Sequence, residues 1–334
     1  MLPPGLSTPR ESAIRISAKK WANGTVLHYC FLNSTDPPGW QWADVQQNVV
    51  RGAFAAWKNL GIGLSFVEVT DPSEAEIVIG CLDGDGSWSL VGTDNLDVNS
   101  RDRGRTLNYG WDLTTTWGGA TALHELGHVI GLSHEHQSPK AGIVWNEPRV
   151  YEYFAGPPNN WSRTTIDQNI IRKLDASEVE GSKWDPASIM EYPFEPGLIL
   201  TPKPYDTQGI GENIMLSQAD KDWVKTWYPP LGQPRAINVM ELQHLDAAAG
   251  QQRDFQFAPD ATRDYTVTTV GESDCRIVVF EMRANEPRHL VSDDDSGTDS
   301  NVVLKTKLVQ GRQYVIRVRV NFVSAPAGVG LLVY

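Results

Sequence analysis

The stretch HELGHVIGLSHEH at residues 124–136 constrains this chain most, because it holds four of the seven histidines. On an α-helix, residues four apart lie one turn above each other on the same face. His124 and His128 can therefore direct both imidazoles at a single metal ion. Glu125 is turned about 100° from His124, too far to bind the same ion but close enough to reach a metal-bound water. That position suits a general base.

His134 would point away from His128 if the helix continued through it. Gly131 lies between them and predicts a left-handed turn that ends the helix, because glycine adopts positive φ without steric cost. The third imidazole can then return to the same ion. Three histidine nitrogens with the fourth position left to water form a catalytic zinc site, whereas structural sites close all four positions with protein ligands. We expect Glu135 to be a solvated glutamate and His136 to be a helix-end histidine, rather than either to be a further ligand.

These residues resemble a known family. The spacing HExxHxxGxxH at 124–134 resembles the zinc-binding signature of the metzincin metalloproteases, and the ending SHEH at 133–136 is similar to the astacin branch. Downstream, SIMEY at 188–192 resembles the methionine turn of that branch. The resemblance implies that Met190 is a hydrophobic floor beneath the zinc. It also implies that Tyr192 ligates zinc at rest and swings away to hydrogen-bond the oxyanion.

The resemblance spans roughly residues 18–230 and implies a fold and an activity. AEIVIG, GSWSLVGTD and TLNYGW are similar to the upper sheet of astacin-like and matrix-metalloprotease-like bacterial and fungal enzymes, and LSQADKDWVKTWYP resembles the helix that closes their catalytic domain. The implied activity is hydrolysis of peptide bonds by a zinc-activated water, with Glu125 as the general base. We expect a protein or peptide substrate to lie extended along the sheet edge, pairing with the strand at 106–111.

The resemblance implies an α+β metzincin domain with a mixed sheet, and the hydrophobic pattern predicts an all-β sandwich after it. Strands are expected at 25–32, 64–69, 75–81 and 106–111, and helices at 43–60, 119–132, 164–174 and from Ser217 to about 228. After a proline-rich stretch, six alternating runs predict an antiparallel β-sandwich. The predicted domains are an N-terminal extension (1–17), a zinc-peptidase domain (18–230), a linker (231–235) and a β-sandwich accessory domain (236–334).

Composition bears on partners and location. The net charge of −12, from 41 acidic and 29 basic residues, gives no basic footprint for nucleic acid. No apolar run is long enough for a membrane helix or a signal peptide. We therefore expect no nucleic-acid partner and no membrane span, and the sequence leaves the oligomeric state open. The resemblance implies a secreted protein whose signal and propeptide are not in this chain.

Two features leave alternatives open. Three cysteines allow at most one internal bridge, for which Cys30 and Cys81 are the pair to test. In an acidic turn near the C-terminus, Asp293, Asp295 and Asp299 offer oxygens to Ca²⁺, although the spacing is not that of an EF-hand and solvated acids are more common. The strands around this turn resemble β-sandwich modules appended to secreted bacterial peptidases.

Two classes of function remain. The first is a zinc endopeptidase with an accessory sandwich. The second is a binding or adhesion protein that keeps the metzincin scaffold with little turnover and recognises its partner through the sandwich. Glu125 favours the first, because a protein that keeps zinc only for binding has no need of a base beside the metal.

Overall fold

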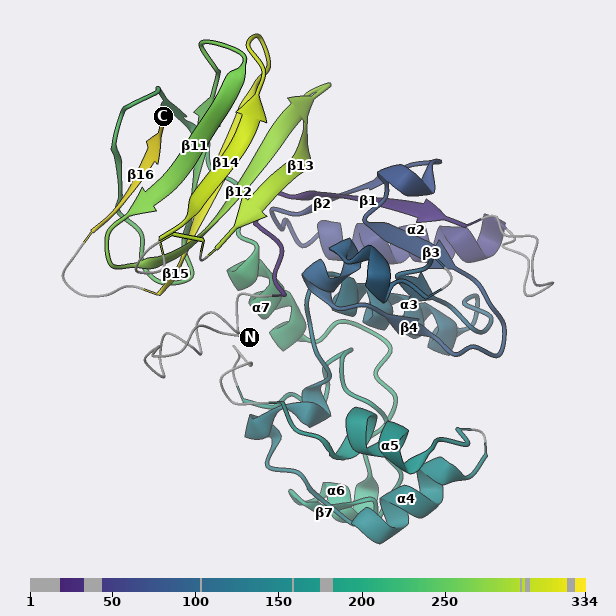
Figure 1. Cartoon of the computed structure of the whole chain (residues 1–334). Coiled ribbons are helices and arrows are strands. Elements are labelled where there is room, and N and C mark those ends of the chain that lie inside the picture. The colour runs from purple at the N-terminus through teal and green to yellow at the C-terminus, as the bar shows by residue number, and fades with distance from the viewer. Residues whose placement is uncertain are drawn as a thin grey trace.

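The computed structural model describes residues 19–32, 44–102, 104–157, 159–174, 183–294, 296–297, 301–322 and 328–334. The predicted N-terminal extension, residues 1–17, lies outside these ranges. The described chain forms an α+β part and then an all-β part, which confirms the predicted fold class (Figure 1). Within the described ranges, no helix is both long and apolar enough to cross a membrane.

A five-stranded mixed sheet forms the upper layer of the α+β part. Its strands, in spatial order, are β2 (Ser65–Glu68), β1 (Val26–Phe31), β3 (Ile77–Gly80), β5 (Leu107–Asn108) and β4 (Trp88–Ser89). The first four run parallel, while β4 pairs antiparallel with β5. The prediction that 106–111 lies at the sheet edge is wrong, because β5 has a strand on each side and β4 forms the edge of the described sheet. The two residues of β4 follow a glycine-rich turn and are too few to show an alternating pattern.

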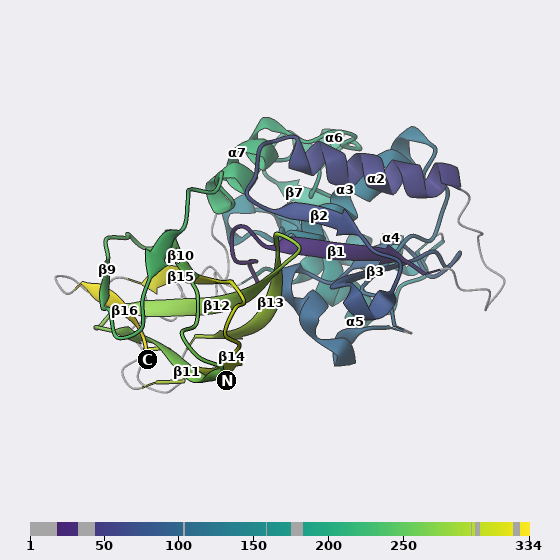
Figure 2. The same ribbon diagram turned by 90° about the horizontal axis from the view of Figure 1, so that it is seen from above.

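One face of this sheet packs on helices. Alternation along β1 and β3 turns every second side chain toward a core shared with α2 (Asp44–Lys58), α3 (Thr116–Val129) and α7 (Gln218–Trp227). Figure 2 shows α2 running along one side of the sheet. Trp57 of α2 is fully buried, and its indole Nε1 donates to the carbonyl of Leu123 in α3 at 3.1 Å. This packing holds α3 in a fixed position against the sheet.

The chain after α3 forms a second, smaller core at the bottom of Figure 1. Its elements are β6 (Val144–Trp145), α4 (Glu147–Ala155), α5 (Arg163–Ile166), a π-helical turn (Asp167–Ile171), β7 (Ile199–Thr201) and α6 (Tyr205–Gln208). The sequence predicted irregular chain here with one helix at 164–174, which is present in a shorter form. It missed α4, which buries only Val150 and Phe154 and has Pro148 in its first turn.

Residues 235–334 form two β-sheets, which we call the C-terminal β region. The sheet orders are β13-β12-β15-β10-β8 and β14-β11-β16-β9. The strands are β8 (Arg235–Ile237), β9 (Gln243–Leu245), β10 (Gln252–Phe257), β11 (Arg263–Val270), β12 (Asp274–Arg283), β13 (Glu286–Asp293), β14 (Val303–Leu308), β15 (Tyr314–Phe322) and β16 (Val329–Val333). Buried side chains from both sheets contribute to one core. The six predicted runs correspond to β10, β11, β12, β14, β15 and β16, whereas β8, β9 and β13 were not predicted.

The C-terminal β region contacts the start of the described chain. The backbone N–H of Asn23 donates to Gln252 Oε1 at 3.0 Å, and Gln252 Nε2 donates to the Asn23 carbonyl at 2.8 Å. The buried guanidinium of Arg317 lies directly against Gly24, where an added Cβ would come within 2.5 Å of Nη2. Residues 23 and 24 therefore form part of the contact between the two parts of the molecule.

The cysteines do not form the bridge considered from the sequence. Cys30 is a buried free thiol whose Sγ contacts the carbonyl oxygens of Phe31 and Thr70, each at 3.6 Å. Burial raises the pKa of this thiol. Because Cys30 is free, no disulfide joins it to Cys81.

Candidate metal centre

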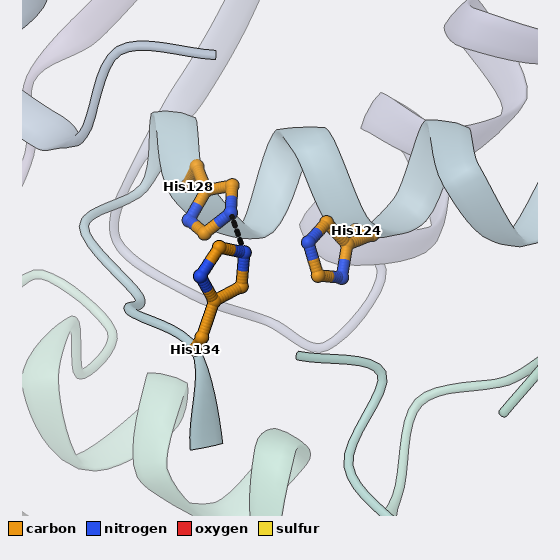
Figure 3. Close-up of side chains that lie close together, drawn as sticks. All are labelled: His124, His128 and His134. Atoms are coloured by element: carbon orange, nitrogen blue, oxygen red, sulfur yellow. Dashed lines mark hydrogen bonds between the residues drawn. The ribbon is translucent and has the colours of Figure 1, made fainter. Parts of the chain in front are cut away.

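Helix α3 presents two histidines on one face. Its first turn is capped by Thr115, whose Oγ1 accepts the N–H of Gly118 at 2.9 Å. His124 and His128 follow on successive turns with ring centroids 4.8 Å apart. Both side chains project from the helix toward the same space (Figure 3). The helix begins and ends three residues earlier than the predicted 119–132.

Gly131 turns the chain back at the end of α3. Its φ of +100° lies in the region that glycine alone adopts readily. The N–H of Gly131 donates to the carbonyl of His128 at 2.8 Å, and that of Leu132 donates to the carbonyl of Gly127 at 2.9 Å, which is the Schellman motif. His134 consequently returns toward α3, and its ring lies beside that of His128 (Figure 3).

The three histidines converge through one nitrogen each. One ligand atom from each of His124, His128 and His134 lies within 4.8 Å of the other two. Each Nδ1 lies within hydrogen-bonding distance of an acceptor oxygen: His124 with the Ile189 carbonyl at 2.7 Å, His128 with the Leu132 carbonyl at 2.8 Å, and His134 with Gln137 Oε1 at 3.3 Å. Since Nδ1 must donate to these oxygens, Nε2 of each neutral ring carries a free lone pair.

The charge state of the cluster fits a cation. Burial lowers the pKa of all three rings, and burial together with the neighbouring His124 lowers that of His128 to about 3. The rings are therefore neutral, and Nε2 of His128 and Nε2 of His134 face each other at 3.1 Å. Two lone pairs repel at that distance unless an electrophile lies between them. Three neutral imidazoles are the ligand set of a catalytic zinc site.

Glu125 places a buried carboxylate next to the cluster. Its side chain is 5% exposed, and Oε2 has no hydrogen-bond partner within the described ranges. Burial raises the pKa of this carboxyl to about 8. A cation held by the histidines would stabilise the carboxylate and oppose that shift. The unpaired oxygen is therefore available to accept a proton from a bound water.

Met190 packs against α3 beside the cluster. It is 1% exposed, and an added Cβ at Gly127 would come within 2.3 Å of its sulfur. The methionine turn can approach α3 this closely only because residue 127 is glycine. The Met190 carbonyl also accepts the N–H of Glu135 at 3.2 Å. The segment that the sequence identified as a methionine turn thus contacts α3 inside the histidine motif and the residue that follows His134.

Asp220, at the start of α7, anchors that turn, and the sequence analysis missed this role. Its Oδ1 accepts the hydroxyl of Ser188 at 2.6 Å, and its Oδ2 accepts the N–H of Ile189 at 2.9 Å and that of Ser217 at 2.8 Å. Ser217 and Asp220 also form the capping box that begins α7, at the position where the sequence predicts the helix start. Because Ile189 holds His124, the side chain of Asp220 supports a histidine of the cluster indirectly.

We expect Asp220→Ala to lower the free energy of unfolding by at least about 2 kcal/mol, because the buried donors of Ser188 and Ile189 lose their acceptor at about 1–3 kcal/mol each. Urea unfolding of the zinc-loaded protein measures this. Asp222 on the same helix is exposed, so Asp222→Ala is the matched control and should change stability by no more than about 0.5 kcal/mol. Equal effects of the two substitutions would show that Asp220 does not anchor the turn.

Tyr192 lies over the cluster. Its ring centroid is 4.4 Å from that of His134 and 5.7 Å from that of His124. Burial, with a smaller contribution from the charge of Glu125, raises the pKa of its phenol. The hydroxyl therefore stays protonated and can donate a hydrogen bond. The ring of Tyr192 thus packs against two of the three histidines of the cluster.

His136 lies in a short 3₁₀ turn (Glu135–Gln137) that follows α3. Its ring is fully buried, and Nε2 lies 2.8 Å from the carbonyl of Asn169, to which it must donate. Its Nδ1 lies 3.6 Å from Oε1 of the buried Glu191 side chain, whose Oε2 accepts the indole N–H of Trp184 at 2.5 Å. His136 thus contacts the smaller core that follows α3, and it is not one of the three clustered histidines. Glu135 is partly buried and accepts the N–H of Asp185 at 3.3 Å.

Two aromatic residues far apart in sequence hold the end of α3. The indole Nε1 of Trp21 donates to the Val129 carbonyl at 2.7 Å, and the Tyr228 hydroxyl donates to the Ile130 carbonyl at 2.7 Å. The backbone N–H of Trp21 in turn donates to the Tyr228 hydroxyl at 3.3 Å. The last carbonyls of the helix are satisfied in this way. No local sequence signal marks these contacts, which join three separate segments.

The calcium prediction gains no support. Asp295 and Asp299 lie outside the described residues, and Asp293 accepts a hydrogen bond from the hydroxyl of Ser296. Across the described ranges, the histidine cluster is the only group of three or more His, Cys, Asp or Glu side chains suited to a metal ion.

Comparison with known proteins agrees with this geometry. The peptidase family described as Astacin matches residues 13–229. The solved structure of myroilysin is 30% identical, with a TM-score of 0.56, and the match covers 64% of this chain and 97% of that one. The pre-peptidase C-terminal domain of a collagenase from Bacillus anthracis covers 30% of this chain and 95% of its own at 10% identity, but its TM-score of 0.25 supports no conclusion. No curated protein matches the chain.

The mixed sheet, the three converging histidines and the methionine turn define a metzincin metallopeptidase. This chain belongs to the astacin family, whose members depend on zinc, and the family resemblance seen in the sequence is confirmed.

Proposed function

We propose that this chain is a zinc endopeptidase that cleaves extended polypeptides. The observation that carries the proposal is the arrangement at α3: three imidazoles, each fixed through Nδ1, converge through Nε2 beside the buried and unpaired carboxylate of Glu125. Zinc bound there would supply a Lewis acid that polarises a carbonyl and makes a water nucleophilic near neutral pH. A protein that kept zinc only for binding would gain nothing from the unpaired carboxylate.

The protein side chains have separate tasks. Glu125 accepts the proton of the attacking water and then passes it to the leaving amine, for which the free Oε2 is suited. Tyr192 donates its hydroxyl to the oxygen of the scissile carbonyl as negative charge develops on it. The carbonyls of Ile189 and Leu132 and the amide of Gln137 keep the imidazoles neutral and oriented.

The proposed binding position of the substrate is along the edge strand of the upper sheet. In the described sheet, β4 (Trp88–Ser89) pairs with β5 on one side only. It also packs against α3, the helix that carries His124 and His128. An extended peptide that adds to β4 would therefore run past the cluster, with its backbone held by main-chain hydrogen bonds. This replaces the expected pairing with the 106–111 segment.

The proposal is tested with internally quenched peptides that are acetylated at the N-terminus and amidated at the C-terminus. An endopeptidase cleaves inside such peptides, whereas an enzyme that must bind a free terminus does not. We expect the zinc-loaded protein to cleave them at internal bonds, and chelation to stop the reaction. Cleavage only of peptides with a free end would contradict the endopeptidase assignment. No cleavage of any peptide, with one zinc bound per chain, would favour the binding or adhesion alternative.

Tyr192→Phe tests the hydrogen-bond donor. We expect kcat to fall about 10²- to 10³-fold, because a single oxyanion donor contributes roughly that much. KM and zinc content should change little, since the ring and its packing on His134 remain. Steady-state kinetics on the same blocked peptides measure the effect. If kcat stays within threefold of the wild-type value, the phenol does not act on the oxyanion.

We further propose that the protein is secreted and that the C-terminal β region stabilises the catalytic part. The first rests on the likeness of its C-terminal strands to modules of secreted bacterial peptidases. The second is supported by the reciprocal hydrogen bonds of Asn23 with Gln252 and by the packing of Arg317 on Gly24. Trp21, two residues before Asn23, binds the end of α3, so this contact reaches the helix that carries two of the histidines.

A further inference from the structure

A stacked pair of indoles lies at the N-terminal end of α3. The ring centroids of Trp111 and Trp117 are 4.5 Å apart, with 27° between the planes. Trp117 is 43% exposed, so a large apolar surface of this pair faces solvent. Exposed aromatic surface of this kind in a protein often marks a binding site. The proposed mechanism gives the pair no role.

The pair lies on the same side of α3 as the metal-binding histidines. Trp117, Thr121, His124 and His128 follow at intervals of four, three and four residues, which keeps them within about 60° of one another around the helix. Thr121 ties the pair to this side, because its Oγ1 accepts the indole N–H of Trp111 at 3.3 Å and donates to the Trp117 carbonyl at 3.0 Å. One surface of the helix thus runs from the indoles to the metal centre.

The edge strand borders the same surface. The N–H of Gly110, directly before Trp111, donates to Ser87 Oγ at 3.1 Å, so the segment that carries this indole is joined to the segment that leads into β4. A peptide extended along β4 would therefore pass both the histidines and the indole pair. Because β4 itself packs on α3, the side chains that the peptide turns toward the helix would meet Trp117.

The separation along the helix sets which substrate residue reaches the pair. Trp117 precedes His124 by seven residues, which is about 10 Å along an α-helix. An extended peptide advances about 3.3 Å per residue. The side chain that meets Trp117 is therefore about three residues from the scissile bond.

We propose that Trp111 and Trp117 form a specificity subsite that binds an aromatic side chain of the substrate, two to three residues from the bond that is cut. The proposal rests on the endopeptidase function above. Offset stacking on an exposed indole suits Phe, Tyr or Trp. An anionic side chain there would lose hydration and meet the negative faces of the indole rings.

The test is a series of blocked peptides in which one Phe is moved through four positions on each side of a constant cleavage site, with glycine as the reference. We expect the zinc-loaded wild-type protein to cleave fastest when Phe stands two or three residues from the site. Trp117→Ala should lower the ratio of kcat/KM for that peptide to kcat/KM for the glycine peptide about five- to tenfold, the value of one aromatic contact. Trp117→Phe should restore much of the ratio.

Tyr334→Ala is the matched control, because Tyr334 is 42% exposed and lies at the end of the C-terminal β region. It should leave the ratio unchanged, and thermal melting checks that each variant is folded. A wild-type protein that cleaves the peptides without preferring Phe at these positions would overturn the subsite but not the endopeptidase function. So would a preference that survives in Trp117→Ala. No cleavage of any peptide would overturn both.

Discussion

Glu125→Gln should abolish nearly all hydrolysis while zinc stays bound. We expect kcat on a blocked peptide to fall about 10²- to 10⁴-fold, the range that a positioned general base contributes. The amide has the same shape as the carboxylate but cannot take a proton, and no histidine of the cluster contacts Glu125 through a hydrogen bond in the described structure. The fall should therefore appear in kcat, with little change in KM.

The control for this substitution is Glu152→Gln, because Glu152 is an exposed glutamate on α4. Its kcat should equal that of the wild type. Zinc content by elemental analysis must be one per chain in all three proteins for the comparison to be valid. Activity of Glu125→Gln within tenfold of the wild type would show that another group takes the proton.

His128→Ala should remove the metal. His128 is the central ligand, since its Nε2 lies 3.1 Å from that of His134 and its ring lies 4.8 Å from that of His124. Loss of a residue that only supports a ligand lowers metal affinity by about 10- to 100-fold, so loss of a ligand should exceed 100-fold. We expect less than one tenth of a zinc per chain after dialysis, and no measurable hydrolysis.

Thermal melting gives a second readout for this variant. Zinc that binds only the folded state raises the melting temperature, and the gain depends on its concentration. The wild type should show this gain, and His128→Ala should not. His244, an exposed histidine in β9, provides the control His244→Ala, which should behave like the wild type. A His128→Ala protein that keeps stoichiometric zinc would contradict the three-histidine centre.

The sequence predicted the part of the site that depends on helix periodicity and on the turn after the helix. The histidines at 124 and 128 share a helix face by periodicity, and Gly131 has the positive φ that the return of His134 requires. The residues that hold the histidines in place could not be predicted from the sequence, because they act through contacts between segments that are far apart in the chain. Asp220 accepts the N–H of Ile189, more than thirty residues earlier in the chain. Its place in a capping box predicts the start of α7 but not this contact.

The burial of His136 and the position of the edge strand were not predicted from the sequence. A polar residue after a helix is usually solvated, but here the lower core folds over His136 and supplies the Asn169 carbonyl as its partner. In the upper sheet, β5 has the stronger strand pattern, yet the outer position belongs to the two-residue β4. The burial of a side chain and the order of strands are set by the whole fold, which a local pattern does not contain.

Most strands of the C-terminal β region, like helix α3, could be predicted from the periodicity of their residues. Alternating apolar residues mark β10, β11, β12, β14, β15 and β16, whose side chains enter one core. The missed strand β13 (Glu286–Asp293) has no fully buried residue and contains Pro287, and it lies at the outer position of its sheet. Proline is tolerated at such an edge, so composition alone argued against a strand that is present.

The central claim, that zinc held by the three histidines makes this chain a peptidase, is tested most directly on an unfolded protein. Casein is incubated with the zinc-loaded protein, with the same protein after chelation, and with chelated protein to which zinc is returned, and new peptide ends are identified by mass spectrometry. We predict internal cleavage that is lost on chelation and restored by zinc. Intact casein in every sample, with one zinc bound per chain, would contradict the claim.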